Sequence, residues 1–135
     1  MPNAKQIDNS RIQFAWTAEI SDFEPNLGNT QMTMQLNPEN IEEALNSDLP
    51  VLIDFFTPTW PPCKRLGPVV DELAEKNEGN AIVAKVDVAE HMELAVKYGV
   101  TGVPTIIVFK GGEVATRETG CRALEDLQSM IDSNA

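Results

Sequence analysis

Two cysteines, Cys63 and Cys121, are the side chains of this chain best suited to covalent chemistry. A cysteine thiolate attacks disulfides and binds metal ions, whereas the protonated thiol does neither well. Together with the single histidine, His91, these residues are too few for a zinc site of thiolates and imidazoles, so we expect no metal. The two cysteines could pair with each other, but their spacing in the sequence does not tell whether their Cα atoms come within about 7 Å.

A third reactive group, the carboxyl group of Asp54, lies inside an apolar segment. The run VLIDFF over residues 51–56 is apolar apart from this acid, as expected for a central strand covered on both faces. We therefore expect the Asp54 carboxyl group to be buried.

The elements that position these side chains follow from hydrophobic periodicity and turn residues. Apolar residues that alternate with polar ones predict strands, and apolar residues three or four apart predict helices. Strands are predicted over residues 11–20, 32–36, 51–56, 81–88, 105–110 and 113–119, and helices over 37–46, 63–77, 91–98 and 123–131. In the helix over 91–98, Met92, Leu94 and Ala95 are the side chains predicted to pack. This order predicts an α/β domain whose sheet begins with parallel strands and ends with an antiparallel hairpin at Gly111-Gly112.

Length, composition and charge limit the class of protein. The 135 residues fit one domain, and 42% hydrophobic and 23% charged residues are ordinary for a globular protein. The formal net charge of -11 repels phosphate backbones and anionic lipids, so we expect neither nucleic acid nor a membrane as a partner. The sequence contains no apolar run of about 18 residues and no signal-like leader, which predicts a cytoplasmic protein.

Several motifs together resemble the thioredoxin family. In order along the chain they are VLIDFF, PPCK with Gly-Pro four residues beyond the cysteine, AKVDV, KYGVTGVPTIIVFKGGEV and ETG. The resemblance implies a three-layer α/β/α sandwich with a mixed central sheet over residues 31–135. Residues 1–30 lie outside it, either as a loosely ordered tail or as an extra strand over 11–20 that covers the sheet edge. Phe14 and Trp16 favour the strand, because two large exposed aromatic side chains would form an interaction patch.

The redox motif of the family is altered here. The family has W-C-G-P-C-K, in which the first cysteine attacks a substrate disulfide and the second resolves the mixed disulfide. Aligned without a gap, Thr59 takes the place of the tryptophan, Trp60 that of the attacking cysteine and Pro61 that of the glycine, while Pro62 and Cys63 keep their identities. A shift by one residue instead aligns Trp60 with the tryptophan and deletes the cysteine. Both alignments lose the attacking thiol, and Trp60 either contacts a partner or only caps the loop.

The resemblance also implies roles for three groups near that motif. Cys63 matches the shielded resolving cysteine, and it is either an inert packing residue or a weak nucleophile. Asp54 resembles the buried acid that helps to deprotonate that cysteine, and Lys85 its charge partner on the next strand. The two form either a remnant of thiol chemistry or a structural ion pair, and the sequence does not give the resulting pKa of Asp54.

A binding surface is implied as well. Pro104 resembles the cis-proline of the family, and with Val103, Gly120 and Pro62 it would form an apolar shelf on which family members bind polypeptide. We call these four residues the shelf. Cys121 follows Gly120, so it is either a surface thiol by chance or a new disulfide partner for Cys63.

These features predict a redox-inactive module that binds a protein or peptide and needs no cofactor. The alternative is a thiol-disulfide oxidoreductase or redox sensor in cell redox homeostasis that acts through Cys63 as a monothiol, with or without Cys121. A third reading is a stable subunit of a larger assembly. The sequence leaves the oligomeric state open.

Overall fold

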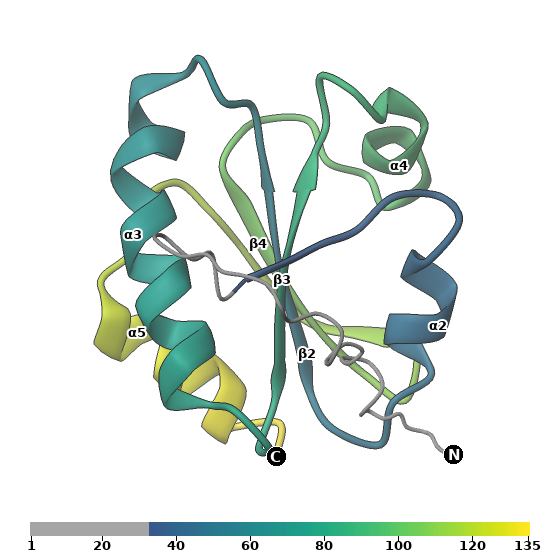
Figure 1. Cartoon of the computed structure of the whole chain (residues 1–135), viewed down its shortest axis with the longest axis vertical. Helices are drawn as coiled ribbons and strands as arrows, with labels where there is room; N and C mark the ends of the chain where they lie inside the picture. The colour runs from purple at the N-terminus through teal and green to yellow at the C-terminus, as the bar shows by residue number, and fades with distance from the viewer. Residues whose placement is uncertain (1–32) are drawn as a thin grey trace, which may run out of the picture. The chain divides into compact units, whose positions relative to one another are not determined.

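Residues 33–135 are described by the structure, a computed structural model, and this range contains five strands and four helices (Figure 1). In chain order they are β1 (Met34–Gln35), α2 (Ile41–Leu45), β2 (Val51–Phe56), α3 (Pro61–Lys76), β3 (Ile82–Asp87), α4 (Met92–Lys97), β4 (Thr105–Lys110), β5 (Glu113–Thr119) and α5 (Leu124–Asp132). The strand predicted over residues 11–20 lies outside the described residues. In the part of the chain that the structure describes, no helix is both long and apolar enough to cross a membrane.

The strands form one mixed sheet in the order β1-β3-β2-β4-β5. β3 is parallel to both β1 and β2, whereas β4 is antiparallel to β2 and β5 is antiparallel to β4. The hairpin between β4 and β5 turns at Gly111 and Gly112, whose φ angles of 62° and 82° suit the tight turns that follow the twist of a hairpin. The predicted mixed α/β sheet is therefore confirmed.

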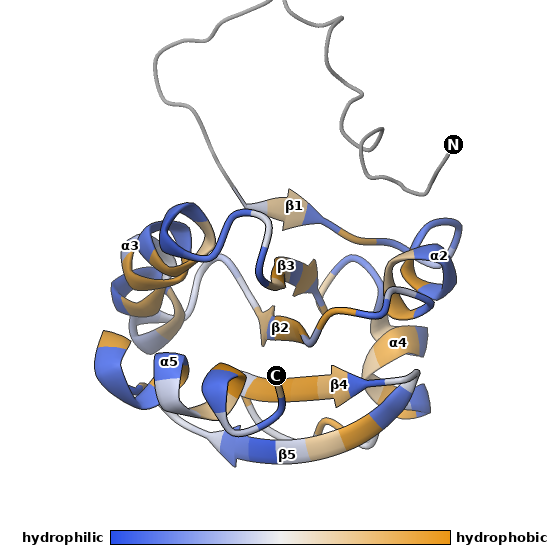
Figure 2. Ribbon diagram, turned by 90° about the horizontal axis from the view of Figure 1, so that it is seen from below, coloured by the Kyte–Doolittle hydropathy of each residue, from blue (hydrophilic) through white to orange (hydrophobic). Residues whose placement is uncertain are grey.

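The helices cover the sheet on both faces, α2 and α4 on one and α3 and α5 on the other (Figures 1 and 2). Because successive side chains of a strand point to opposite faces of the sheet, β2 contributes side chains to the hydrophobic core on each face. Val51, Ile53 and Phe55 belong to the core under α2 and α4, and Leu52 belongs to the core under α3 and α5. The same alternation turns Asp54 toward the α3 side, and the register pairs it with Lys85 on β3.

Helix α3 carries the altered motif at its first turn. We predicted a start at Cys63, but the helix begins two residues earlier, at Pro61. Proline suits the first turn of a helix, because its φ is already helical and its missing N–H would have no partner within the helix. The helix continues through Pro68, and Trp60 stands at the N-cap position in an extended conformation.

Three predictions at other elements were wrong in part. Within residues 33–36 of the strand predicted over 32–36, β1 covers only Met34–Gln35. The helix predicted from Asn37 begins only at Ile41, because the Asn37 side chain accepts hydrogen bonds from the Glu39 and Asn40 N–H groups and holds a turn first. In α4, Met92 is not a packing residue: its side chain is 66% exposed, and Leu94 and Ala95 are the buried residues of that helix.

Candidate functional site

Trp60 occupies the exposed approach to the N-terminus of α3. Its N–H donates to the Thr57 carbonyl over 3.4 Å, and its own carbonyl accepts from the Lys64 N–H over 3.1 Å. The backbone of the residue therefore caps the helix, while the side chain makes no capping hydrogen bond and is 49% exposed. The indole therefore presents an apolar surface and one N–H donor to solvent.

Cys63 lies one helical turn further in and is only 3% exposed. Burial is the main cause that raises the pKa of its thiol, and the negative charge of Asp54 raises it further. Hydrogen bonding by Thr57 acts in the opposite direction but does not reverse the shift. The Cys63 thiol is therefore both shielded from solvent and held in its protonated, less nucleophilic form.

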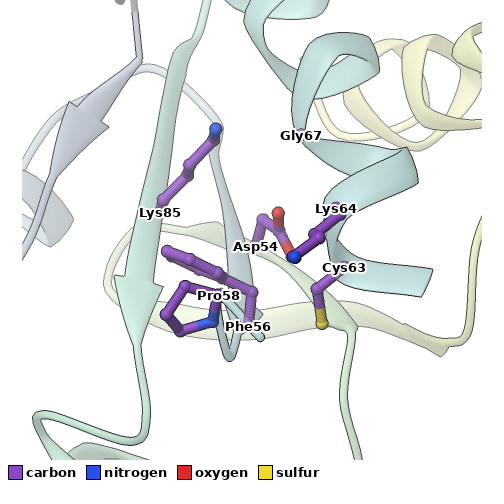
Figure 3. Close-up of a pocket in the computed structure, with 7 residues that line it drawn as sticks. All are labelled: Asp54, Phe56, Pro58, Cys63, Lys64, Gly67 and Lys85. Atoms are coloured by element: carbon purple, nitrogen blue, oxygen red, sulfur yellow. The ribbon is translucent and has the colours of Figure 1, made fainter. Parts of the chain in front are cut away.

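A cavity of about 190 Å³ connects Cys63 with the sheet. Figure 3 shows the Asp54 side chain on β2 between that of Lys85 on β3 and that of Cys63 on α3. The cavity is lined by Asp54, Phe56, Pro58, Cys63, Lys64, Gly67 and Lys85. Sequence reasoning had singled out Asp54, Cys63 and Lys85 among them and had missed the other four. Gly67 belongs there because a Cβ at this position would lie 3.7 Å from the Lys85 Nζ atom, so the ammonium group rests against the helix backbone.

The Asp54 carboxyl group is 1% exposed, as predicted, and within residues 33–135 its Oδ1 atom has no hydrogen-bond partner. Burial raises its pKa to about 7. The positive charge of Lys85 lowers this pKa and the negative charge of Asp71 raises it, both less than burial does. Near neutral pH the group therefore exists in both protonation states.

One of the two readings for Asp54 and Lys85, a structural ion pair between them, is not what the structure shows. Among the described residues, the carboxylate at salt-bridge distance from Lys85 is that of Asp71, with Nζ 3.2 Å from Oδ1. Asp71 lies on α3 and also accepts a hydrogen bond from the Thr33 hydroxyl. Its place could have been found from helical spacing, because residues 63, 67 and 71 follow one another at intervals of four along one helix face.

The shelf residues come together from three segments of the chain. The peptide bond between Val103 and Pro104 is cis. The Gly120 N–H donates to the Pro104 carbonyl over 2.8 Å, and Gly120 has a φ of 99°, which favours glycine. Cys121 then turns toward α3, where its thiol donates to the Pro62 carbonyl with an Sγ–O distance of 3.6 Å. Pro62, Pro104, Gly120 and Cys121 are thus neighbours, although about sixty residues separate the first from the last.

The two cysteines differ in exposure. Both are free thiols in this structure, Cys63 buried and Cys121 exposed. Within residues 33–135, no three side chains of histidine, cysteine, aspartate or glutamate gather in a way that could hold a metal ion. The site therefore offers one shielded thiol, one open thiol, a buried acid and a tryptophan beside the shelf.

Comparisons with known proteins agree with this fold. The family model described as Thioredoxin matches residues 32–133. Thioredoxin 1 of Nostoc sp. is 46% identical over 93 residues, which cover 69% of this chain and 87% of that protein. The mitochondrial thioredoxin of Mus musculus is 33% identical over 102 residues, which cover 76% of this chain and 61% of the mouse protein. Among solved structures, a mutant thioredoxin from Halobacterium salinarum superposes with a TM-score of 0.71 at 34% identity, covering 78% of this chain and 93% of that one.

Proposed function

The chain belongs to the thioredoxin family, and we propose that it is a polypeptide-binding domain that does not exchange disulfides at the N-terminus of α3. One observation carries the proposal: the position open to an incoming substrate holds the half-exposed indole of Trp60, and the thiol that remains on α3, that of Cys63, is 3% exposed. Indole has no nucleophilic group for disulfide exchange, but it is among the side chains most often found at the centre of binding surfaces.

Loss of exchange at α3 follows from what the reaction requires. An attacking thiol must be accessible and must ionise near the working pH. Cys63 meets neither condition, because burial hides it from solvent and also raises the pKa of its thiol. A monothiol activity through Cys63 alone is therefore the weaker candidate function.

Retention of binding is supported by the shelf. Its backbone is fixed by the hydrogen bond from Gly120 to Pro104, so an extended polypeptide would meet a surface that is already in place. Trp60 and the exposed Pro61 border this surface and offer apolar contact area. The formal net charge of -11 would favour encounter with positively charged polypeptides rather than acidic ones.

The domain limits, the class of partner and the location that we propose follow from the sequence. Residues 1–30 are an extension to a thioredoxin-like domain over residues 31–135, the partner is a protein or peptide, and the chain works in the cytoplasm. Neither nucleic acid nor a membrane is a partner, for the reason of charge given above.

A titration followed by NMR tests the proposal. The probe is the S-aminoethylated insulin B chain, an unfolded and positively charged polypeptide without thiols, added to the reduced full chain. We expect the signals of the Trp60 indole, Val103 and Gly120 to shift, and Trp60→Ala to weaken binding about tenfold or more, as for a central aromatic residue.

Val114→Ala is the matched control. Val114 is also an exposed apolar side chain, but its register partner Phe109 lies opposite Val51, at the end of β2 away from the N-terminus of α3. Binding should be unchanged in this variant. Shifts that avoid the shelf, or equal loss of binding in both variants, would contradict the proposal.

A further inference from the structure

The Cys121 thiol lies close to the backbone of Cys63 at the edge of the shelf. The Cys121 Sγ atom lies 3.6 Å from the carbonyl oxygen of Pro62, the residue directly before Cys63. A carbonyl oxygen lies within about 3 Å of the Cα atom of the next residue, so Cys121 Sγ is within about 7 Å of the Cys63 Cα. The two thiols are also close enough to interact electrostatically, because Cys121 is one of the groups that raise the pKa of the Cys63 thiol.

The segment that carries Cys121 can move the remaining distance toward Cys63. It joins β5 to α5 without regular secondary structure, and Gly120 begins it with a left-handed φ of 99°. The Arg122 side chain is tied to Glu118 and to the Cys121 carbonyl, over 2.8 and 3.1 Å, and both contacts are exposed. Exposed ion pairs add little stability, so a small shift of Cys121 toward α3 costs little.

We propose that Cys63 and Cys121 form a reversible disulfide and that this bond regulates polypeptide binding on the shelf. The inference rests on the proposed function for its effect on binding, but not for the bond itself. It gives the cysteine left on α3 a new partner from a distant part of the chain, in place of the attacking thiol that both alignments lack.

The oxidant is a small disulfide of the glutathione type, and the exposed thiol reacts first. The Cys121 thiolate attacks one sulfur of glutathione disulfide, forms a mixed disulfide and releases one glutathione thiolate. Cys63 then loses its proton, for which the Asp54 carboxylate in the same cavity is an acceptor, and attacks the Cys121 sulfur. This step releases the second glutathione thiolate. The protein gives up two electrons and two protons, and the glutathione disulfide takes up the electrons.

The bond changes the shelf because both of its anchors adjoin shelf residues. Cys63 follows Pro62 and Cys121 follows Gly120, so closing the bond pulls Gly120 toward α3 and strains its hydrogen bond to Pro104. The gap between these segments, where an extended polypeptide would lie, becomes narrower. We expect oxidation to weaken polypeptide binding about tenfold, a common size of coupling between two linked events.

Mass spectrometry of the full chain tests whether the disulfide between Cys63 and Cys121 forms. The chain is equilibrated with mixtures of glutathione and glutathione disulfide, alkylated with N-ethylmaleimide, and measured intact and after proteolysis. The oxidised chain should lack two hydrogen atoms, carry no alkyl label, and yield one cross-linked peptide that contains Cys63 and Cys121. Dithiothreitol should restore two labelled thiols.

Two variants make the test specific. Cys63→Ser should stop at a glutathione adduct on Cys121, because no resolving thiol is left. Cys121→Ser should keep an unmodified Cys63 thiol in the same mixtures, because that thiol is shielded. A wild-type chain that stops at the Cys121 adduct, or that joins to a second chain through Cys121, would overturn the proposal.

Affinity for the S-aminoethylated insulin B chain is then compared between the reduced and the oxidised wild type. A drop of about tenfold on oxidation, reversed by dithiothreitol, is the expected result. Equal affinities with the bond in place would overturn the regulatory part. If the bond forms but the reduced chain does not bind the probe, the proposed function fails while the disulfide site stands.

Discussion

Lys85 Nζ lies 3.2 Å from Asp71 Oδ1, and this ion pair stands beside the buried carboxyl group of Asp54. The two charges act on Asp54 in opposite directions, since Lys85 lowers its pKa and Asp71 raises it. Burial is therefore left as the dominant influence, and the acid titrates close to neutral pH.

The free energy of unfolding should fall as the pH rises from about 4 to about 7, and then level off. Asp54 has a pKa of about 7 in the folded chain and about 4 when unfolded, so the unfolded chain ionises it more easily. The contribution of Asp54 to the free energy of unfolding is therefore greatest below about pH 4, where the group is protonated in both states. This contribution is lost progressively as the pH rises to the pKa of the folded chain. The loss reaches about 4 kcal/mol, because folding raises the pKa of Asp54 by about three units.

Asp54→Asn should remove this dependence and stabilise the chain at pH 8 by about 2–4 kcal/mol, measured by urea unfolding between pH 5 and pH 8. Asp48→Asn is the control, since Asp48 is exposed. If both variants keep the wild-type slope with pH, the raised pKa of Asp54 is refuted.

Lys85→Met should raise the pKa of Asp54 further above 7. The variant removes the positive charge that now lowers the pKa, while the methionine keeps most of the length of the buried side chain. A titration of the Asp54 carboxyl carbon by ¹³C NMR measures the shift. No change, or a fall, would mean that the Lys85 charge does not reach Asp54.

Trp60→Cys should produce a catalyst of insulin disulfide reduction by dithiothreitol. The variant places a thiol at the exposed N-terminus of α3, where the helix dipole favours a thiolate. We expect a rate at least about tenfold above that of the wild type, which should not exceed dithiothreitol alone. Trp60→Cys combined with Cys63→Ser should lose the gain, because the mixed disulfide can no longer be resolved. Reduction by the wild type that is lost in Cys63→Ser would instead favour the monothiol function.

The two thiols should react with iodoacetamide at very different rates in the native chain. Cys121 is exposed and should be labelled at once, whereas Cys63 should react about a hundredfold more slowly until urea unfolds the domain. Peptide mapping after timed quenching measures both. The variant Cys121→Ser isolates Cys63, and rapid native labelling of this variant would contradict its burial.

Deleting residues 1–30 should lower the melting temperature. The alternating apolar residues over 11–20 predict a strand that covers a sheet edge, and each kcal/mol lost would lower the melting temperature of a domain of about 100 residues by about 4–8 °C. Calorimetry of the shortened and full chains makes the comparison. An unchanged melting temperature would reject the strand.

Most elements of the described fold could be predicted because their signals are local. The run at 51–56, the strand at 105–110 and the glycine turn at 111–112 match β2, β4 and the hairpin residue for residue. The errors occur where local signals compete. At Asn37 a side-chain turn precedes the helix, and at Met92 an apolar residue in the first helical turn lies outside the buried face.

The candidate site was predictable only as a set of residue types. The resemblance placed Trp60 at or directly before the position of the attacking thiol of the family, and the apolar run over 51–56 put Asp54 in the core, because both follow from positions close together in the chain. Only the tertiary structure decided that Lys85 pairs with Asp71 and that Cys121 reaches Pro62. Each of these contacts depends on how a distant helix or loop packs on the sheet, and a few ångströms of packing decide which charge or thiol is nearest.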